Sequence, residues 1–285
     1  MEKYNWLDKE LYPFNTKTEN IDGYKMSYVD EGVGDNLLFI HGTPSWSFEF
    51  RKLIVGLKGK FRCIAPDHIG FGLSAKPIGI DYSPAGHAIR LKLFIEKLQL
   101  KQIHLVVHDF GGPVGLSTAM EIPGNILSIS ILNTWMWSLN EYSHFTTPAK
   151  LIQTGLGKFL YEKLNFSAKV LIKGGFFDKR KLTKRIHDQY KNAQDKDARK
   201  AAYQFALSLL GASSWYDELW DKRFELQNIP TTIFWGMNDK LLPANLLLDK
   251  WKVGFPNANV IEIENAGHFP QEENEEIIIS TLRNQ

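Results

Sequence analysis

The chain has 285 residues and a formal net charge of +2, with 44% hydrophobic and 23% charged residues, a composition that excludes extensive disorder. The small net charge disfavours binding to nucleic acid or an anionic membrane, and the single cysteine, Cys63, excludes an internal disulfide framework. Because no apolar run has the length of a signal peptide or of the roughly 20 residues that span a bilayer, we expect a soluble, cytoplasmic protein.

Short, nearly continuous apolar runs recur along the chain, which is typical of strands buried on both faces of a parallel sheet. They cover residues 24–32, 35–42, 62–67, 102–109, 126–134, 231–239 and 259–268. Residues 84–99 lie between two of these runs and show a helical pattern, with Ser83 as N-cap and Pro84 in the first turn. The alternation of strands and helices predicts an α/β fold with a mostly parallel, doubly wound sheet.

The alternation stops in a segment rich in lysine and helix formers, residues 135–225. Helical patterns occur there near 147–163, 180–193 and 197–210. We interpret the segment as a helical cap over the carboxyl ends of the strands, inserted into a core made of residues 1–134 and 226–285. The charge-dense stretch 177–200 alternates acids with bases, which favours a solvated helical surface over a nucleic-acid site.

A sharp strand-to-helix turn is predicted where "VVHDFGG" (106–112) follows an apolar run. Gly111 and Gly112 allow the strand and the helix to approach closely, and the amides at the helix start favour an anion. In α/β-hydrolases such a turn presents a serine within G-x-S-x-G, which is absent from this sequence. Asp109 stands in its place, either as a nucleophile or simply as a cap of the next helix.

Three other strand ends carry groups that would complete a hydrolase site. In "HGTPSW" (41–46), the backbone N–H of Thr43 could form an oxyanion hole together with that of Phe110, while His41 is expected to be structural. "GMNDKLLP" supplies Asp239 and "NAGHFPQEE" supplies His268. The order nucleophile, acid, histidine is that of the hydrolases, and it predicts the triad Asp109, Asp239 and His268.

An aspartate nucleophile narrows the reaction. A serine that displaced a halide from an alkyl carbon would leave an inert ether, whereas Asp109 would leave an ester that water can cleave. The expected substrate therefore has an sp³ carbon with a leaving group, either a halide or an epoxide oxygen. His268, oriented by Asp239, would activate the water, and neither a metal nor an organic cofactor is expected.

On these motifs the chain resembles the haloalkane dehalogenase and epoxide hydrolase group of cap-bearing α/β-hydrolases. The quoted stretches "HGTPSWSFEFR", "DHIGFGLSAKP", "HDFGG", "GMNDKLLP" and "AGHFPQEE" carry the resemblance over nearly the whole core. It implies hydrolysis of small alkyl halides by Asp109, Asp239 and His268. "DHIGFGLS" has only one G-x-G and lies after an inner strand, so a dinucleotide-binding loop is disfavoured.

The halide site departs from the dehalogenase pattern. These enzymes usually place a tryptophan directly after the nucleophile, where this chain has Phe110, and often an asparagine where it has Thr43. The candidate donors to a halide are Trp135 and Trp137, with Trp46 and Trp215 also open. Asn133 stands where some dehalogenases carry the acid, so Asp239 is the expected acid.

Several alternatives remain at this point. Epoxide hydrolases use the same triad with two cap tyrosines, for which the chain offers Tyr142, Tyr161, Tyr190, Tyr203 and Tyr216. Phe110 and Pro113 argue against a fluoroacetate dehalogenase. A non-catalytic binding module would be expected to lose a triad member, and a serine esterase lacks its serine. The expected partner is a small-molecule substrate, and the oligomeric state stays open.

Overall fold

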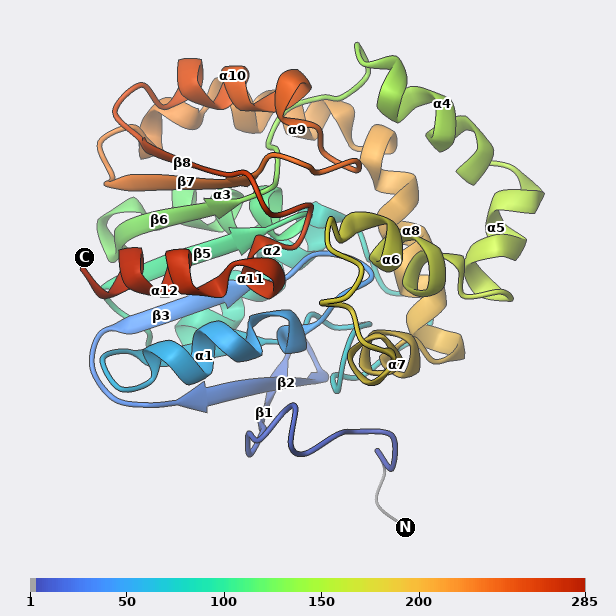
Figure 1. The fold of residues 1–285 in the computed structure, drawn as a ribbon, viewed down its shortest axis with the longest axis horizontal. Helices are drawn as coiled ribbons and strands as arrows, with labels where there is room; N and C mark the ends of the chain where they lie inside the picture. The colour runs from blue at the N-terminus through green and yellow to red at the C-terminus, as the bar shows by residue number, and fades with distance from the viewer. Residues whose placement is uncertain (1–3, 285) are drawn as a thin grey trace.

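The computed structural model describes residues 4–284, which form one eight-stranded sheet with helices on both faces (Figure 1). The strand order is β1-β2-β4-β3-β5-β6-β7-β8; β2 pairs antiparallel with both neighbours and the remaining pairs are parallel. The strands are β1 (Lys17–Ile21), β2 (Tyr24–Glu31), β3 (Asn36–Ile40), β4 (Arg62–Pro66), β5 (Ile103–His108), β6 (Ile126–Leu132), β7 (Thr231–Gly236) and β8 (Asn259–Ile263).

All seven predicted strands are present, and the mostly parallel α/β fold class is confirmed. The edge strand β1 was not predicted from the sequence. Its segment, "KTENI", is polar and mostly exposed, so it lacks the apolar run by which the other strands were recognised. It is held by pairing with β2 rather than by burial of its side chains.

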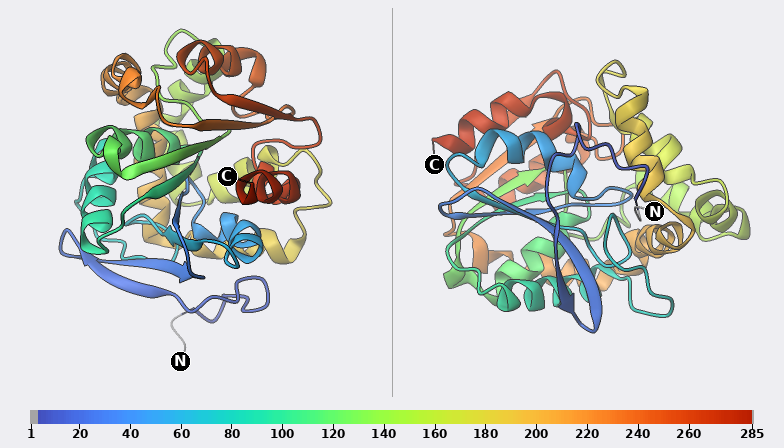
Figure 2. Two further views of the ribbon diagram at one scale, coloured as in Figure 1. Left: turned by 90° about the vertical axis from the view of Figure 1, so that its left-hand side faces the viewer. Right: turned by 90° about the horizontal axis from the view of Figure 1, so that it is seen from below.

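Helices cover the two faces of the sheet over separate apolar cores. The helix α1 (Arg51–Leu57) packs against α12 (Glu275–Arg283), and α2 (Pro84–Lys97) packs against α3 (Gly111–Glu121) on the other face (Figure 2). In β3, Leu38 and Ile40 belong to one core and Leu37 and Phe39 to the other, as the alternation of side chains along a strand requires. Further helices of the core are η1 (Ser47–Phe50), η2 (Pro123–Asn125), α10 (Ala244–Gly254) and α11 (Pro270–Glu273).

The predicted N-cap of α2 is confirmed. The side chain of Ser83 accepts a hydrogen bond from the backbone N–H of Gly86, at 3.1 Å, and Pro84 occupies the first turn. This cap satisfies a donor that the first turn of a helix cannot pair internally.

Between β6 and β7 the described chain forms helices only, and we call this helical insertion the cap. Its helices are α4 (Ser143–Ile152), α5 (Gly155–Glu162), η3 (Ser167–Leu171), α6 (Ile172–Gly175), α7 (Lys184–Ala193), α8 (Lys196–Gly211), α9 (Ser213–Asp221) and η4 (Arg223–Leu226). In Figure 1, α4 to α8 lie at the right, beyond the carboxyl ends of the parallel strands β3 to β6. No helix within residues 4–284 is long and apolar enough to cross a membrane.

One predicted cap helix is wrong in its extent. Residues 147–163 form parts of α4 and α5 rather than one helix, and the chain turns between them at Thr154. The hydroxyl of Thr154 accepts the N–H of Gly157 at 3.2 Å and so starts a new helix. The apolar positions continue across this turn, which explains why the pattern alone suggested a single helix.

Candidate active site

The turn after β5 directs Asp109 out of the sheet. Asp109 has a φ of 51°, in the left-handed region that is unfavourable for most residues other than glycine. A Cβ at Gly111 would lie 2.1 Å from the carbonyl oxygen of Ile40, and one at Gly112 would lie 1.8 Å from Oγ1 of Thr134. Both glycines are therefore required by close packing, and the tight turn that they allow places the Asp109 carboxylate at the sheet edge.

The Asp109 carboxylate is surrounded by donors. The backbone N–H of Thr43 donates to Oδ2 at 2.9 Å, the N–H of Phe110 also hydrogen-bonds to the carboxylate, and Nε2 of His268 lies 3.5 Å from Oδ1. Burial alone would raise the pKa of Asp109, but the hydrogen bond and the positive charge of His268, the neighbouring His108 and the N–H of Phe110 lower it below its usual value. The carboxylate is therefore ionised at neutral pH, as a nucleophile must be.

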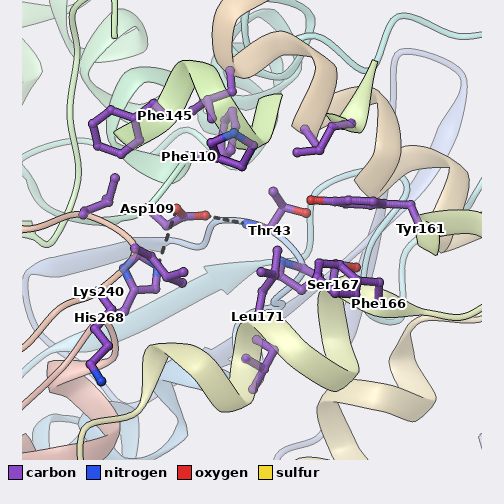
Figure 3. A pocket seen from close by; sticks show the side chains of 18 of the residues that line it. Thr43, Asp109, Phe110, Phe145, Tyr161, Phe166, Ser167, Leu171, Lys240 and His268 are labelled. Carbon is purple, nitrogen blue, oxygen red and sulfur yellow. Dashed lines mark hydrogen bonds and ion pairs between the residues drawn. The ribbon is translucent and has the colours of Figure 1, made fainter. Parts of the chain in front are cut away.

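The two other predicted triad residues meet at the same place. Nδ1 of His268 lies 2.8 Å from Oδ2 of Asp239. The other oxygen of Asp239 accepts the backbone N–H groups of Leu241 and Leu242, at 2.7 and 2.9 Å. Asp239 follows β7 and His268 follows β8, so loops after three parallel strands bring the three side chains together. Figure 3 shows Asp109 and His268 at this place.

The residue after β6 supports the acid. Nδ2 of Asn133 donates to Oδ2 of Asp239 at 2.9 Å, and its Oδ1 accepts the N–H of Gly236 at 2.8 Å. From the sequence, Asn133 was noted only because some dehalogenases carry their catalytic acid at this position. Its contribution is to hold the acid supplied by the neighbouring strand, which no local pattern could reveal.

The histidine strongly favours its protonated form. Burial lowers the pKa of His268, but the charge of Asp239 and the hydrogen bonds to Asp109 and Asp239 outweigh this effect and raise it to about 10. In the resting site His268 is thus an imidazolium between two carboxylates. Esterification of Asp109 would remove one of these negative charges, lower the pKa of His268 and make it available as a base.

Because the pKa of His268 is raised, we expect the free energy of unfolding to depend on pH. Because the folded-state pKa of His268 is raised from 6.5 to about 10, its contribution is complete below pH 6.5 and is lost as the pH rises toward 10. The difference in unfolding free energy between wild type and His268→Gln should therefore shrink over this range. Urea unfolding of both proteins across the range measures it, and a difference that stays constant or grows would contradict the ion-pair assignment.

A cavity of about 380 Å³ opens between the cap and these residues (Figure 3). A volume of this size is within the range of small-molecule sites. Thr43, Asp109, Phe110 and His268 line it at the sheet, and Tyr161 reaches it from the cap. Most of the other lining side chains are apolar, and they include Phe145, Pro148, Leu151, Leu160, Phe166, Leu171 and Leu209.

Of the four tryptophans considered as halide donors, Trp135 lines this cavity. Trp135 packs edge-to-face on Phe110, with ring centroids 4.8 Å apart, and its indole N–H is buried without a hydrogen-bond partner. The expectation that Trp137 faces the pocket is wrong, because its ring packs on Trp220 and Trp251 away from the cavity. The other two candidates, Trp46 and Trp215, do not line the cavity either.

The cap tyrosines are mostly engaged elsewhere. Of the five that the sequence offers, Tyr161 lines the cavity. The hydroxyl of Tyr190 donates to Glu272 at 2.6 Å, and that of Tyr203 donates to the carbonyl of Ile152 at 3.1 Å. Tyr216 is enclosed in the apolar core, and Tyr142 packs against the same core.

Glu273, a buried residue that no sequence motif pointed to, connects the cap to the loop that contains His268. The carboxylate of Glu273 accepts the backbone N–H groups of Gly267 in that loop and of Phe177 and Asp178 in the cap, at 2.7, 3.2 and 2.7 Å. The N–H of His268 itself donates to the cap carbonyl of Gly175 at 2.8 Å. The position of His268 therefore depends on where the cap lies.

Within residues 4–284 no group of His, Cys, Asp and Glu side chains is arranged to hold a metal ion.

Comparisons with known proteins agree with this architecture. Residues 35–275 match the family described as alpha/beta hydrolase fold. The chain is 30% identical over 268 residues to Haloalkane dehalogenase 2 of Mycobacterium tuberculosis, covering 93% of each protein. It is 31% identical over 287 residues to the cis-3-alkyl-4-alkyloxetan-2-one decarboxylase of Shewanella oneidensis, covering 96% of this chain and 88% of that protein.

A solved structure has the same fold. The haloalkane dehalogenase DbeA of Bradyrhizobium elkani superposes with a TM-score of 0.85 at 21% identity, covering 95% of this chain and 97% of that one. The family match spans the core strands from β3 to β8 together with the cap between β6 and β7. The chain therefore belongs to the alpha/beta hydrolase family and is related within it to the haloalkane dehalogenases.

Proposed function

We propose that this protein hydrolyses carbon–halogen bonds of small alkyl halides to an alcohol and a halide ion. The observation that carries the proposal is an ionised carboxylate, Asp109, directed into an apolar cavity with the His268–Asp239 pair beside it. A carboxylate in this position can attack an sp³ carbon and form an ester that is then hydrolysed.

In the first step an Asp109 oxygen attacks the alkyl carbon in line with the carbon–halogen bond. The new C–O bond forms as the C–X bond breaks, and the halide leaves with the electron pair. A halide in an apolar cavity needs hydrogen-bond donors, because an unsolvated anion is costly. The buried, unpartnered indole N–H of Trp135 supports a role as one such donor, alongside the buried, unpartnered hydroxyl of Thr43.

Once Asp109 is esterified, His268 releases its Nε2 proton to solvent. In the second step water attacks the ester carbonyl carbon of Asp109, and Nε2 of His268 takes a proton from that water. The N–H groups of Thr43 and Phe110 would stabilise the resulting oxyanion, since both already bind the carboxylate. Collapse of this intermediate releases the alcohol, which takes the proton from His268, and leaves Asp109 as a carboxylic acid. Transfer of that acid's proton to His268 restores the carboxylate and the imidazolium. Asp239 keeps the histidine oriented throughout.

A ring-opening reaction of a β-lactone is the second candidate. It is favoured by the related oxetanone decarboxylase and by Phe110, whose side chain offers no donor to a halide. Such a lactone also has an sp³ carbon bearing an oxygen leaving group, so Asp109 could displace the ring carboxylate there. Loss of that carboxylate as CO₂ would then form an alkene as the Asp109 carboxylate leaves. Epoxide hydrolysis is less supported, because one cap tyrosine, rather than the two that this reaction requires, lines the cavity.

Product analysis separates these reactions. Purified protein is incubated with n-butyl bromide, ethylene dibromide or n-hexyl iodide, with styrene oxide, and with a cis-dialkyl oxetanone. We expect halide and alcohol from the alkyl halides and no diol from the epoxide. Release of CO₂ from the lactone without any halide release would replace the proposal by decarboxylation, and diol without halide would replace it by epoxide hydrolysis.

A further inference from the structure

A second carboxylate–imidazole pair lies behind the first. Oε1 of Glu49, in η1, is 3.0 Å from Nδ1 of His108, the last residue of β5, and both residues are fully buried. Nε2 of His108 is 2.6 Å from the backbone carbonyl oxygen of His268, and the two imidazole rings are 4.7 Å apart. The mechanism described above uses neither Glu49 nor His108.

The direction of the central hydrogen bond is fixed by chemistry. A carbonyl oxygen can only accept, so Nε2 of His108 must carry a hydrogen and donate it to His268, whatever the charge of the ring. The other nitrogen faces the Glu49 carboxylate, with the amide nitrogen of Gln271 also 3.2 Å away. A carboxylate at one imidazole nitrogen fixes the orientation of the ring and of the opposite N–H.

This donor holds the main chain of His268 from the core side. The N–H of His268 is bound by the carbonyl of Gly175 in the cap, and its carbonyl is bound by His108 in the sheet. His108 directly precedes Asp109, so one rigid strand end holds the nucleophile and also the backbone of the histidine that must later activate water. We propose that His108 is a positioning residue for His268, and that Glu49 fixes the ring that donates this hydrogen bond.

The two half-reactions depend on this contact differently. Displacement of the leaving group uses the Asp109 carboxylate. Hydrolysis of the ester also needs the His268 imidazole correctly placed between the attacking water and Asp239. Loss of the His108 donor should therefore slow ester hydrolysis and leave the first displacement largely intact. This kinetic consequence rests on the proposed function.

The test compares two amides at position 108. The amide nitrogen of glutamine reaches the place of imidazole Nε2, whereas that of asparagine reaches only the place of Nδ1. Because removal of the imidazole would leave the Glu49 carboxylate buried without its partner, both changes are made in the Glu49→Gln background. The single variant Glu49→Gln is the reference. The side-chain amide N–H of its glutamine can donate to Nδ1 of His108, so that Nε2–H of His108 still donates to the His268 carbonyl.

Rapid-quench kinetics with n-butyl bromide then measure both steps. We expect a burst of about one halide per protein molecule in every variant, with a steady-state rate about 10- to 100-fold lower for His108→Asn and within about 3-fold of the reference for His108→Gln. A partly unfolded variant would show a smaller burst instead. Equal steady-state rates for the two variants, or loss of the burst rate in His108→Asn alone, would overturn the proposal.

A second readout does not need turnover. In protein labelled with ¹⁵N-histidine, the His268 Nδ1–H proton bound to Asp239 gives an imidazole signal that is identified by its absence in His268→Phe. We expect this signal to persist in wild type and in the His108→Gln variant and to broaden or move in the His108→Asn variant. An unchanged signal in both variants refutes the positioning role, even if alkyl halides prove not to be substrates.

Discussion

Replacement of Asp109 by asparagine is expected to lower halide release by about 10⁴-fold or more. The neutral amide is a poor nucleophile, and attack by its oxygen would not give the ester that water cleaves. The fold should persist, because asparagine tolerates a positive φ and its side-chain oxygen can still accept the N–H of Thr43. Halide release is measured with n-butyl bromide, and intact mass shows that the asparagine has not reverted to aspartate.

The same substitution at a remote ion pair provides the control. Asp30 is a largely buried carboxylate on β2 that pairs with Lys17 and Arg62, far along the sheet from the cavity. Asp30→Asn should lower the thermal stability but retain the halide-releasing activity of the folded protein. If Asp109→Asn kept a tenth or more of the wild-type rate, or if both variants lost activity alike, Asp109 would not be the nucleophile.

The residues proposed for catalysis were accessible from the sequence because their types are constrained chemically and their positions topologically. Asp109, Asp239 and His268 each follow an apolar run, and the carboxyl ends of neighbouring parallel strands meet at one edge of a sheet. The distances of 3.5 and 2.8 Å between their side chains agree with that expectation. The two glycines after Asp109 are likewise explained by the packing that their sequence position suggested.

Side-chain direction in the loops was not accessible in this way. Trp135 and Trp137 are two residues apart, yet one lines the cavity and the other packs on Trp220 and Trp251. The course of the chain after β6 decides between them, and this segment contacts Asp217 and Trp220 of α9 and Trp251 of α10. Apolar periodicity predicts that both are buried, as they are, but it does not say against what.

The sequence also did not predict polar contacts between residues that are far apart in the chain. Glu49 and His108 are 59 residues apart, and the carbonyl that His108 binds is a further 160 residues along the chain. Glu273 joins two cap amides that lie 95 and 96 residues before it to the histidine loop. A single sequence shows such charged or polar residues only as isolated departures from an apolar pattern. Their pairing follows from the packing of the cap and α11 on the sheet, which local propensity does not encode.

Replacement of His268 by phenylalanine is expected to trap the covalent intermediate. Displacement needs only an ionised Asp109. After the imidazolium is gone, the N–H of Phe110 still lowers the pKa of this carboxyl and the N–H of Thr43 still binds it. Ester hydrolysis loses its base and should slow by about 10³-fold or more. The variant should therefore release about one halide per molecule and then stop, while its mass increases by one butyl group less a hydrogen.

Two further variants test which residue carries the trapped butyl group and whether the loss of His268 is what traps it. The double change Asp109→Asn with His268→Phe should show neither the burst nor the mass increase, because the acceptor oxygen is no longer a carboxylate. His104→Phe replaces a histidine of the same strand as His108, where its ring contacts Ser128 near the opposite end of the strand. This variant should keep turning over and lose its adduct once the substrate is consumed. A butyl group found on a residue other than Asp109, or continued turnover by His268→Phe, would require another path for the water. An adduct confined to Asp109 would instead show that displacement and hydrolysis are separate steps carried by separate side chains.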